Sequence, residues 1–432
     1  MIIKIHRGTR EIGGSCVEIA HGKDRIVIDM GLPLIGDDGC GKADISKKIG
    51  TLPEIEGLYS SDESKKRVSA LFVSHAHLDH YGLIHHADRR VPVFLGRATR
   101  ELIEISCAMS GGSVAPDAWA PLDDRKPLEA GCFRVTPFLV DHSAMDAYAF
   151  LVEAGDRKVF YSGDFRAHGR KGRLMKGIIE DDIQDIDALI LEGTNIASRR
   201  KAKSETDIED ELARFFKRKK DGIVLVSASS QNLDRLVSIY KAARKAGKTL
   251  VIDPYTAFVL DAMAKYGRFP DFSGAFGGLK VFFPTFITGK LVDLGCWPKI
   301  VNFSKFKITK EELTERRSGI VMMVKSSMKP NLRGLKALEG GSLVWSMWDG
   351  YLKEESSRRF LEFLGRQGMD LGAPAGLKVI HTSGHADLET LKSFAASLAP
   401  KTIIPIHTMN PEKYGETFNN AIMLKDGEEF EI

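Results

Sequence analysis

The segment from His75 to His80 packs three imidazoles and one carboxylate into six residues, with the spacing His-x-His-x-Asp-His. Imidazole and carboxylate groups suit Zn²⁺ and similar divalent ions. The apolar run 71–73 just before the segment predicts a buried strand, and side chains that follow a strand end can face one point. An accidental surface cluster is the alternative, but this spacing is far more specific than a lone histidine pair. The segment therefore predicts a metal-dependent hydrolase.

Other apolar runs in the chain also end in, or just before, a polar side chain that could belong to the same site. The predicted strands are 26–29, 158–161, 189–191, 377–380 and 402–406, and the polar side chains at or after their ends include Asp29, Asp164, Glu192, His381 and His407. We expect sheet layers that deliver these side chains to one shared edge.

At about residue 204 the sequence pattern changes from short apolar runs that end in polar residues to an alternation of strands and helices. Ser204 is a good helix N-cap, with Asp207 three residues on in the capping-box position. Apolar residues then follow at helical spacing, and the predicted strands 223–226 and 249–252 alternate with helices. This β-α-β-α-β course predicts a small parallel-sheet domain over about 205–365. After this domain, the earlier pattern of short strands that end in polar residues resumes.

Composition sets limits on the class of protein. A length of 432 residues with 43% hydrophobic content suggests two or three domains with a sizeable core, and a net charge of +4 argues against a strong polyanion binder as a whole. We find no signal peptide and no apolar run long enough to span a membrane. The five cysteines lack C-x-x-C spacing: Cys16, Cys40, Cys107, Cys132 and Cys296. We therefore expect a cytoplasmic protein without membrane association or a cysteine metal site.

Several of these residues, taken together, resemble the motifs of a known family. Taken in order, Asp29, the His75–His80 segment, His142 and Asp164 resemble the metal motifs of the metallo-β-lactamase superfamily. The match extends to Glu192, His385 in Thr-Ser-Gly-His-Ala, His407 in Pro-Ile-His-Thr and the opening 9–14, and this set resembles the β-CASP branch of nucleases, especially ribonuclease J and its relatives.

The resemblance implies an α/β fold: an αββα metallo-β-lactamase sandwich with an inserted β-CASP-type parallel α/β domain. The first part of the metallo-β-lactamase domain would span 1–204 and the insert 205–365. The return segment 366–432 would complete the sandwich and its site.

The resemblance also implies a site for two divalent metal ions, with Zn²⁺ favoured and manganese or iron as alternatives. One ion would be bound by His75, His77 and His142, the second by Asp79, His80 and His407, and Asp164 would bridge them. Two such ions can generate a hydroxide near neutral pH and stabilise the phosphate under attack. Asp29 would support the site through hydrogen bonds instead of binding metal.

Three residues carry the implied acid and base roles. Asp79 would act as general base, and Glu192 would orient a protonated His385 that donates its proton to the leaving oxygen. His381, Ser383 and Gly384 are candidates for contact with a substrate phosphate. Other interpretations remain open. The Ser383–His385 turn could bind a phosphate near a helix start without His385 acting as an acid, and Glu192 or His407 could be purely structural.

Positive charge is uneven, with 14 Lys and Arg against 7 Asp and Glu from Arg199 to Lys248. The run 217–220 ends a predicted helix whose start is acidic, which complements the helix dipole and favours a solvated terminus over an RNA contact. Arg199, Arg200, Lys201 and Lys203 follow Glu192 closely, so they are better placed to meet a substrate, and a flexible basic loop is an equal alternative.

The chain also departs from the ribonuclease J pattern. It reads Val324–Pro330 where those proteins usually carry a Thr-Gly-Ser-Gln-Gly-Glu type segment, and Thr-Met-Asn follows His407 in place of Gly-Glu. The sequence given ends at Ile432, without the extra C-terminal domain that those proteins use in self-association. The exonuclease mode, the substrate and a homo-oligomer therefore stay open.

Three functions are compatible with these residues. We expect a ribonuclease that cleaves phosphodiester bonds of single-stranded RNA by a metal-activated hydroxide, with RNA as its partner. A metallo-hydrolase of a small ester, lactone or phosphodiester is the alternative, although such an enzyme has no need of a basic cleft. A nucleic-acid-binding subunit that has lost catalysis would be expected to lack metal ligands, and the set here is complete.

Overall fold

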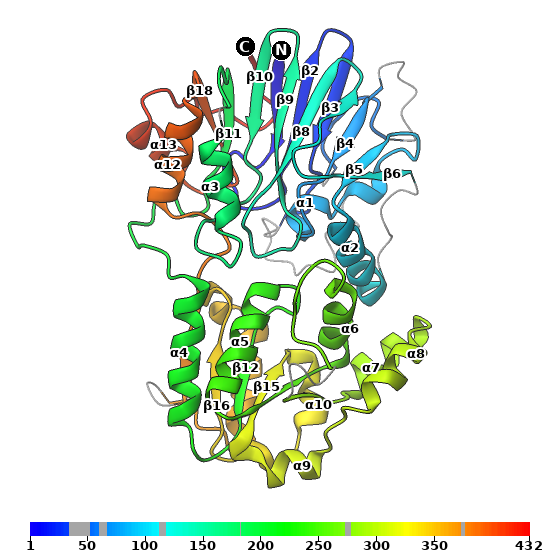
Figure 1. Ribbon diagram of the computed structural model, residues 1–432, viewed down its shortest axis with the longest axis vertical. Coiled ribbons are helices and arrows are strands. Elements are labelled where there is room, and N and C mark those ends of the chain that lie inside the picture. The colour runs from blue at the N-terminus through cyan, green and yellow to red at the C-terminus, as the bar shows by residue number, and fades with distance from the viewer. Residues whose placement is uncertain (34–51, 60–66, 112–117, 182, 273–277, 373–375) are drawn as a thin grey trace. The chain divides into compact units, whose positions relative to one another are not determined.

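The computed structural model describes residues 1–33, 52–59, 67–111, 118–181, 183–272, 278–372 and 376–432. The chain divides into two compact units. Unit 1 combines Met1–Ala202 with Gly384–Ile432, and unit 2 is the continuous segment Lys203–Ser383 (Figure 1). Cys40 lies outside the described residues, and the other four cysteines are free. No helix in the described part of the chain is long and apolar enough to cross a membrane.

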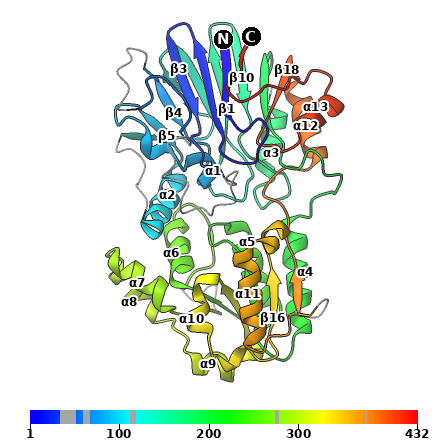
Figure 2. The same cartoon turned by 180° about the vertical axis from the view of Figure 1, so that it is seen from behind.

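Unit 1 contains two sheets that lie face to face (Figures 1 and 2). The first sheet has the strand order β19 (Glu429–Glu431), β1 (Ile2–Arg7), β2 (Cys16–His21), β3 (Asp24–Ile28), β4 (Ala70–Phe72), β5 (Val93–Leu95) and β6 (Trp119–Pro121). The second has the order β18 (Thr402–Ile406), β11 (Ala188–Glu192), β10 (Arg157–Tyr161), β9 (Tyr148–Ala154), β8 (Phe133–Leu139) and β7 (Leu128–Ala130).

The two sheets bury a shared apolar core between them. Side chains of alternate residues on facing strands fill it, and the rings of Phe72 on β4 and Phe150 on β9 lie with their centroids 5.6 Å apart. Alternation along each strand leaves the other face of the sheet for helices or solvent. The core therefore fixes the strand ends, from which the site residues project.

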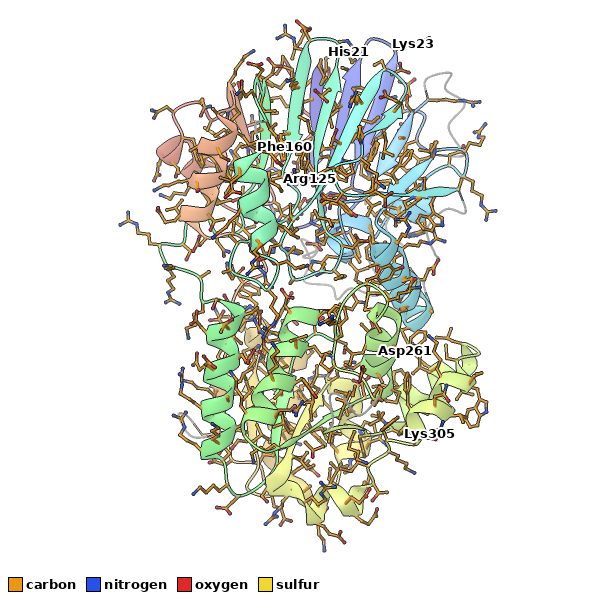
Figure 3. All side chains as sticks on the ribbon, viewed as in Figure 1. His21, Lys23, Arg125, Phe160, Asp261 and Lys305 are labelled. Atoms are coloured by element: carbon orange, nitrogen blue, oxygen red, sulfur yellow. The ribbon has the colours of Figure 1, made fainter. Side chains whose placement is uncertain are left out.

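Helices cover the outer face of the second sheet. They are α3 (Arg173–Glu180), α12 (Leu388–Leu398) and α13 (Glu412–Thr417). Phe160, labelled on β10 in Figure 3, packs in the core of this layer, with its ring centroid 5.8 Å from that of Phe394 on α12. The short helix α1 (Leu78–Tyr81) and the longer α2 (Arg97–Ser110) lie near β4 and β5 in both views (Figures 1 and 2).

Unit 2 is built on one parallel sheet, as the β-α-β-α-β course predicts. Its strand order is β14 (Leu279–Val281), β13 (Thr249–Ile252), β15 (Ile320–Val324), β12 (Val224–Ser227), β16 (Ser342–Trp345) and β17 (Leu377–Val379). The helices are α4 (Glu205–Arg218), α5 (Leu233–Lys245), α6 (Pro254–Met263), α7 (Thr285–Asp293), α8 (Trp297–Ser304), α9 (Lys310–Glu315), α10 (Lys329–Leu332) and α11 (Glu355–Arg366). The predicted capping box of Ser204 and Asp207 is present at the start of α4.

The predicted α/β class, a two-sheet sandwich interrupted by a parallel α/β unit, is confirmed. Unit 2 ends at Ser383 instead of near residue 365, because β17 pairs in parallel with β16 and not with a strand of unit 1. A strand of three residues carries too little pattern to indicate which sheet it joins.

A buried ion-pair group on the first sheet gives a prediction about stability. His6 Nε2 lies 2.7 Å from the carboxylate of Glu18, and Arg25 donates to the other carboxylate oxygen. Burial by itself raises the pKa of Glu18, but the hydrogen bonds and charges of these two partners outweigh it and lower the pKa to about 2. The folded-state pKa therefore lies below the value of about 4.3 in an unfolded chain.

We expect Glu18→Gln to lower the free energy of unfolding by about 1–3 kcal/mol near pH 7. Because the carboxylate pKa is lower in the folded protein, its stabilisation is present above pH 4.5 or so and is lost as the pH falls toward 2. Thermal unfolding of both proteins, followed by circular dichroism from pH 7 to pH 3, should show a Tm difference that narrows with acid. A difference that stays constant over this range would contradict the assignment.

Candidate active site

The candidate site residues that lie in unit 1 come from the ends of its strands. His75 and His77 lie in the loop between β4 and α1, Asp79 and His80 lie on α1, and Glu192 is the last residue of β11. Three others follow β8, β10 and β18: His142, Asp164 and His407. His385 lies just before α12.

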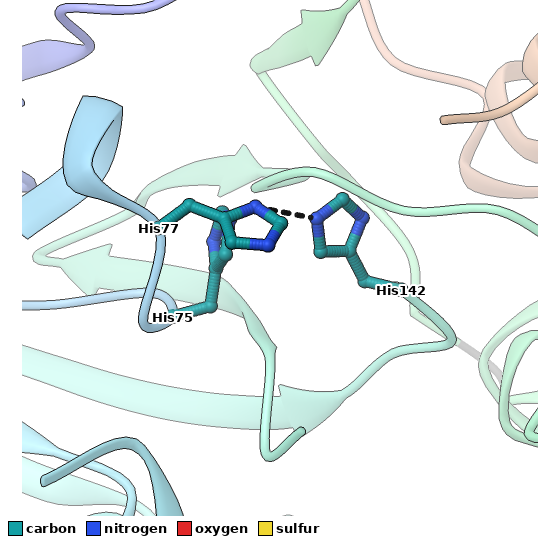
Figure 4. Close-up of side chains that lie close together, drawn as sticks. All are labelled: His75, His77 and His142. Atoms are coloured by element: carbon teal, nitrogen blue, oxygen red, sulfur yellow. Dashed lines mark hydrogen bonds between the residues drawn. The ribbon is translucent and has the colours of Figure 1, made fainter. Parts of the chain in front are cut away.

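Three histidines form the first candidate metal group. The Nε2 atoms of His75 and His142 lie 3.1 and 3.2 Å from Nδ1 of His77, and Figure 4 shows the His77 and His142 rings facing each other. Burial, with smaller contributions from neighbouring histidines, holds the pKa of His75 and of His142 well below the usual value. Burial also lowers the pKa of His77 to about 4. All three rings are therefore neutral near pH 7.

The chemistry of this group fits a cation. A neutral imidazole carries one N–H, so Nδ1 of His77 can donate well to only one of the two Nε2 atoms that face it. The remaining lone pairs converge without protons between them. A divalent ion would accept all three, as in the three-nitrogen zinc sites of proteins.

Asp79, His80 and His407 form the second candidate metal group, with one potential ligand atom of each within 4.8 Å of the others. His407 Nε2 lies 3.2 Å from Oδ2 of Asp79. Burial raises the pKa of Asp79, but the hydrogen bond from His407 and the positive charge of nearby histidines outweigh it, and the pKa is lower than usual. Asp79 is therefore an anion at neutral pH.

Asp164 lies between the two groups. Its Oδ2 atom is 3.1 Å from His80 Nε2, 3.7 Å from His407 Nε2 and 3.9 Å from His75 Nε2. Burial alone would raise the pKa of this carboxyl, but the positive charges of His407 and His80 outweigh it and hold the pKa well below its usual value. An anion that close to histidines of both groups has the position required of a bridging ligand.

Asp29 holds the second group from behind. Its carboxylate, fully buried, accepts hydrogen bonds from the Ser74 backbone N–H at 2.7 Å and from the Tyr161 hydroxyl at 2.8 Å. Its Oδ2 atom also lies 2.8 Å from Nδ1 of His80, which leaves Nε2 of that ring facing Asp164. A carboxylate on the far nitrogen of a ligand histidine fixes its tautomer and raises its basicity.

We therefore expect Asp29→Asn to weaken metal binding by about 10–100-fold, with most of the fold retained. Competition with a chromophoric chelator would measure the affinity. Asp187→Asn is a matched control, because Asp187 is also buried but precedes β11, at the end of that strand opposite Glu192. Equal affinity in the two variants would contradict the supporting role of Asp29.

Glu192 and His385 form a pair beside Asp164. His385 Nδ1 lies 3.5 Å from Oε1 of Glu192 and 3.6 Å from Oδ2 of Asp164. Burial lowers the pKa of His385, but the two carboxylates outweigh it and raise the pKa to about 9. Glu192 is held by the backbone N–H groups of Thr194 and Ala386, at 3.0 and 3.2 Å.

The three predicted phosphate contacts are divided between the units. His381 and Ser383 belong to unit 2, where His381 Nδ1 lies 3.2 Å from a guanidinium nitrogen of Arg235. Gly384 belongs to unit 1 and passes close to the histidines: an added Cβ would lie 2.8 Å from Ser143 Oγ and 3.4 Å from a ring carbon of His142. Glycine at this position thus permits the close approach.

Thr194 also supports the site, although the sequence did not predict this role. The Thr194 hydroxyl lies 2.8 Å from Nδ1 of His407 and so orients that ring toward Asp79. The only signal in the sequence is its place two residues after Glu192, because the partner lies 213 positions away.

The chain is similar to known proteins over much of its length. The model of the beta-lactamase superfamily domain matches residues 56–225, and that of the Zn-dependent metallo-hydrolase RNA specificity domain matches 374–414. Ribonuclease J of Mycobacterium tuberculosis is 24% identical over 408 residues, which cover 93% of this chain and 67% of that protein. Ribonuclease J of Mycoplasma genitalium is 25% identical over 243 residues, 55% of this chain and 41% of that protein.

The chain thus spans about two fifths to two thirds of the length of these relatives. A crystal structure of a protein of unknown function from Enterococcus faecalis is similar with a TM-score of 0.79 and 22% identity, covering 99% of both chains. That likeness supports the fold.

Proposed function

We propose that this chain, which belongs to the metallo-β-lactamase superfamily and resembles ribonuclease J of the β-CASP branch, is a metal-dependent ribonuclease. Its substrate would be single-stranded RNA, and unit 2 would be its inserted β-CASP domain. The observation that carries the proposal is the Glu192–His385 pair beside Asp164. A phosphodiester with a poor leaving group needs an acid, and this pair supplies one next to the metal groups.

Two metal ions would be held by the residues described above, His75, His77 and His142 on one side and Asp79, His80 and His407 on the other, with Asp164 between them. The mixed nitrogen and oxygen donors suit zinc, and manganese or iron would also fit. When bound, such a pair of cations activates water as a nucleophile and stabilises the charge that develops on the phosphate.

The residues of the chain would handle the protons. Asp79 is anionic at neutral pH and can accept a proton from the attacking water. His385, whose pKa is raised to about 9, is protonated at neutral pH and can donate to the leaving oxygen. Glu192 would keep the ring in place and favour its charged form. General acid catalysis of this kind contributes about 10²–10⁴-fold in rate.

A substrate panel tests the proposed activity. The metal-loaded protein should cleave end-labelled single-stranded RNA, and the ladder of products would give the direction and the endonuclease or exonuclease mode. A small ester, a lactone and bis(p-nitrophenyl) phosphate complete the panel. Turnover of the ester or lactone without cleavage of RNA would overturn the proposal in favour of a small-molecule hydrolase.

A further inference from the structure

A groove of about 760 Å³ lies in unit 1, outside the candidate metal groups. Residues 198–201, which follow β11, line it together with residues of helices α3 and α12, and these two helices lie side by side (Figure 1). Three of the lining side chains are apolar: Ala167, Ile179 and Leu388. The charged ones are Arg199, Arg200, Lys201, Asp387, Glu389 and Lys392.

Several positively charged side chains of the groove form no ion pair with the described acidic side chains around them. Arg199, Arg200 and Lys201 are exposed, and no carboxylate of the described chain forms an ion pair with them. The acids, by contrast, are engaged. Asp387 caps α12 by accepting from the backbone N–H of Thr390 at 3.0 Å, and Glu389 lies 3.3 Å from the ammonium of Lys392. Three cations are thus available to an anionic ligand.

The basic segment is tied at both ends to the chain that carries His385. Before it, the Asn195 amide donates to the backbone oxygens of His385 and Ala386, at 3.2 and 3.1 Å. After it, the backbone N–H of Ala202 donates to the Asp387 carboxylate at 3.1 Å. The segment that carries the three cations is therefore anchored on both sides to residues 385–387, and it is not a free loop.

We propose that Arg199, Arg200 and Lys201 form a phosphate-binding strip that holds the RNA backbone beside the scissile bond. This inference rests on the proposed ribonuclease function and names a binding site for the same substrate. Lysine and arginine attract phosphates independently of base sequence, and such contacts fix the register of a strand without reading it. A nucleotide bound here would strengthen the binding of the strand whose scissile phosphodiester meets His385.

The test replaces the three cations by neutral residues of similar length. In Arg199→Gln/Arg200→Gln/Lys201→Gln, three lost phosphate contacts should raise the KM for a single-stranded RNA on the order of 100-fold near 0.1 M salt, with kcat unchanged. The slope of log KM against log salt should fall by about 2. Hydrolysis of bis(p-nitrophenyl) phosphate, which is too small to reach the groove, should not change.

The matched control removes the same charge elsewhere. Lys217→Gln/Arg218→Gln/Lys220→Gln neutralises the end of α4, where basic residues complement the helix dipole. This control should keep the wild-type KM and salt slope for RNA. Equal KM values in the two triple variants would overturn the strip while leaving the ribonuclease function intact. Wild-type protein that hydrolyses bis(p-nitrophenyl) phosphate but neither binds nor cleaves RNA would overturn both.

Discussion

Replacing His385 by alanine should lower the rate of RNA cleavage by about 10²–10⁴-fold while leaving metal binding nearly intact. The reason is that His385 would protonate a leaving oxygen whose own basicity is high, and no other described side chain is paired with Glu192 in this way. Single-turnover cleavage of end-labelled RNA would measure the loss. Metal analysis of the same samples would show that both groups remain filled.

The leaving group distinguishes an acid from a structural residue. A p-nitrophenolate departs without protonation, so hydrolysis of bis(p-nitrophenyl) phosphate should fall far less in His385→Ala than cleavage of RNA does. His86→Ala serves as the matched control, since His86 lies on the 3-10 turn Ile84–His86, outside the candidate metal groups. An equal loss on both substrates would contradict the acid role and indicate a general disturbance of the site.

Replacing His77 by alanine should abolish cleavage of RNA and of bis(p-nitrophenyl) phosphate alike. His77 is the ring that faces both His75 and His142, so its loss leaves the first group with two donors. Metal analysis should show one ion fewer, and added zinc should raise Tm less than in the wild type, because ligand binding stabilises the folded state. His77→Ala protein with full metal content and activity would contradict the proposed ligand set.

Much of the candidate site could be predicted because the types of its residues and their spacing can be read directly from the sequence. The His75–His80 segment lies directly after a short strand, and Asp164, Glu192 and His407 lie at or just after the ends of neighbouring strands β10, β11 and β18. A parallel arrangement of those strands brings their ends to one edge. Strand ends and donor types are both local properties, so the sequence alone could indicate them.

The contacts that the sequence did not predict depend on which strands pair and in what register. Glu18 meets His6 and Arg25 because β1, β2 and β3 pair antiparallel, with a shift of register between Ile5 and Arg7 that no local pattern specifies. Thr194 reaches His407 for the same reason, through the pairing of β11 with β18. Unit 2 extends beyond residue 365 because β17 pairs with β16, the preceding strand of the same sheet, and not with a strand of unit 1. The pairing of strands, and not local propensity, decides these features.

The most direct test of the central claim is a titration of metal into stripped protein while cleavage of end-labelled single-stranded RNA is followed. The account predicts no cleavage after chelation, and activity that rises with added zinc or manganese and levels off at two ions per chain. Cleavage that persists without metal, or protein that holds two ions and leaves RNA intact, would contradict it.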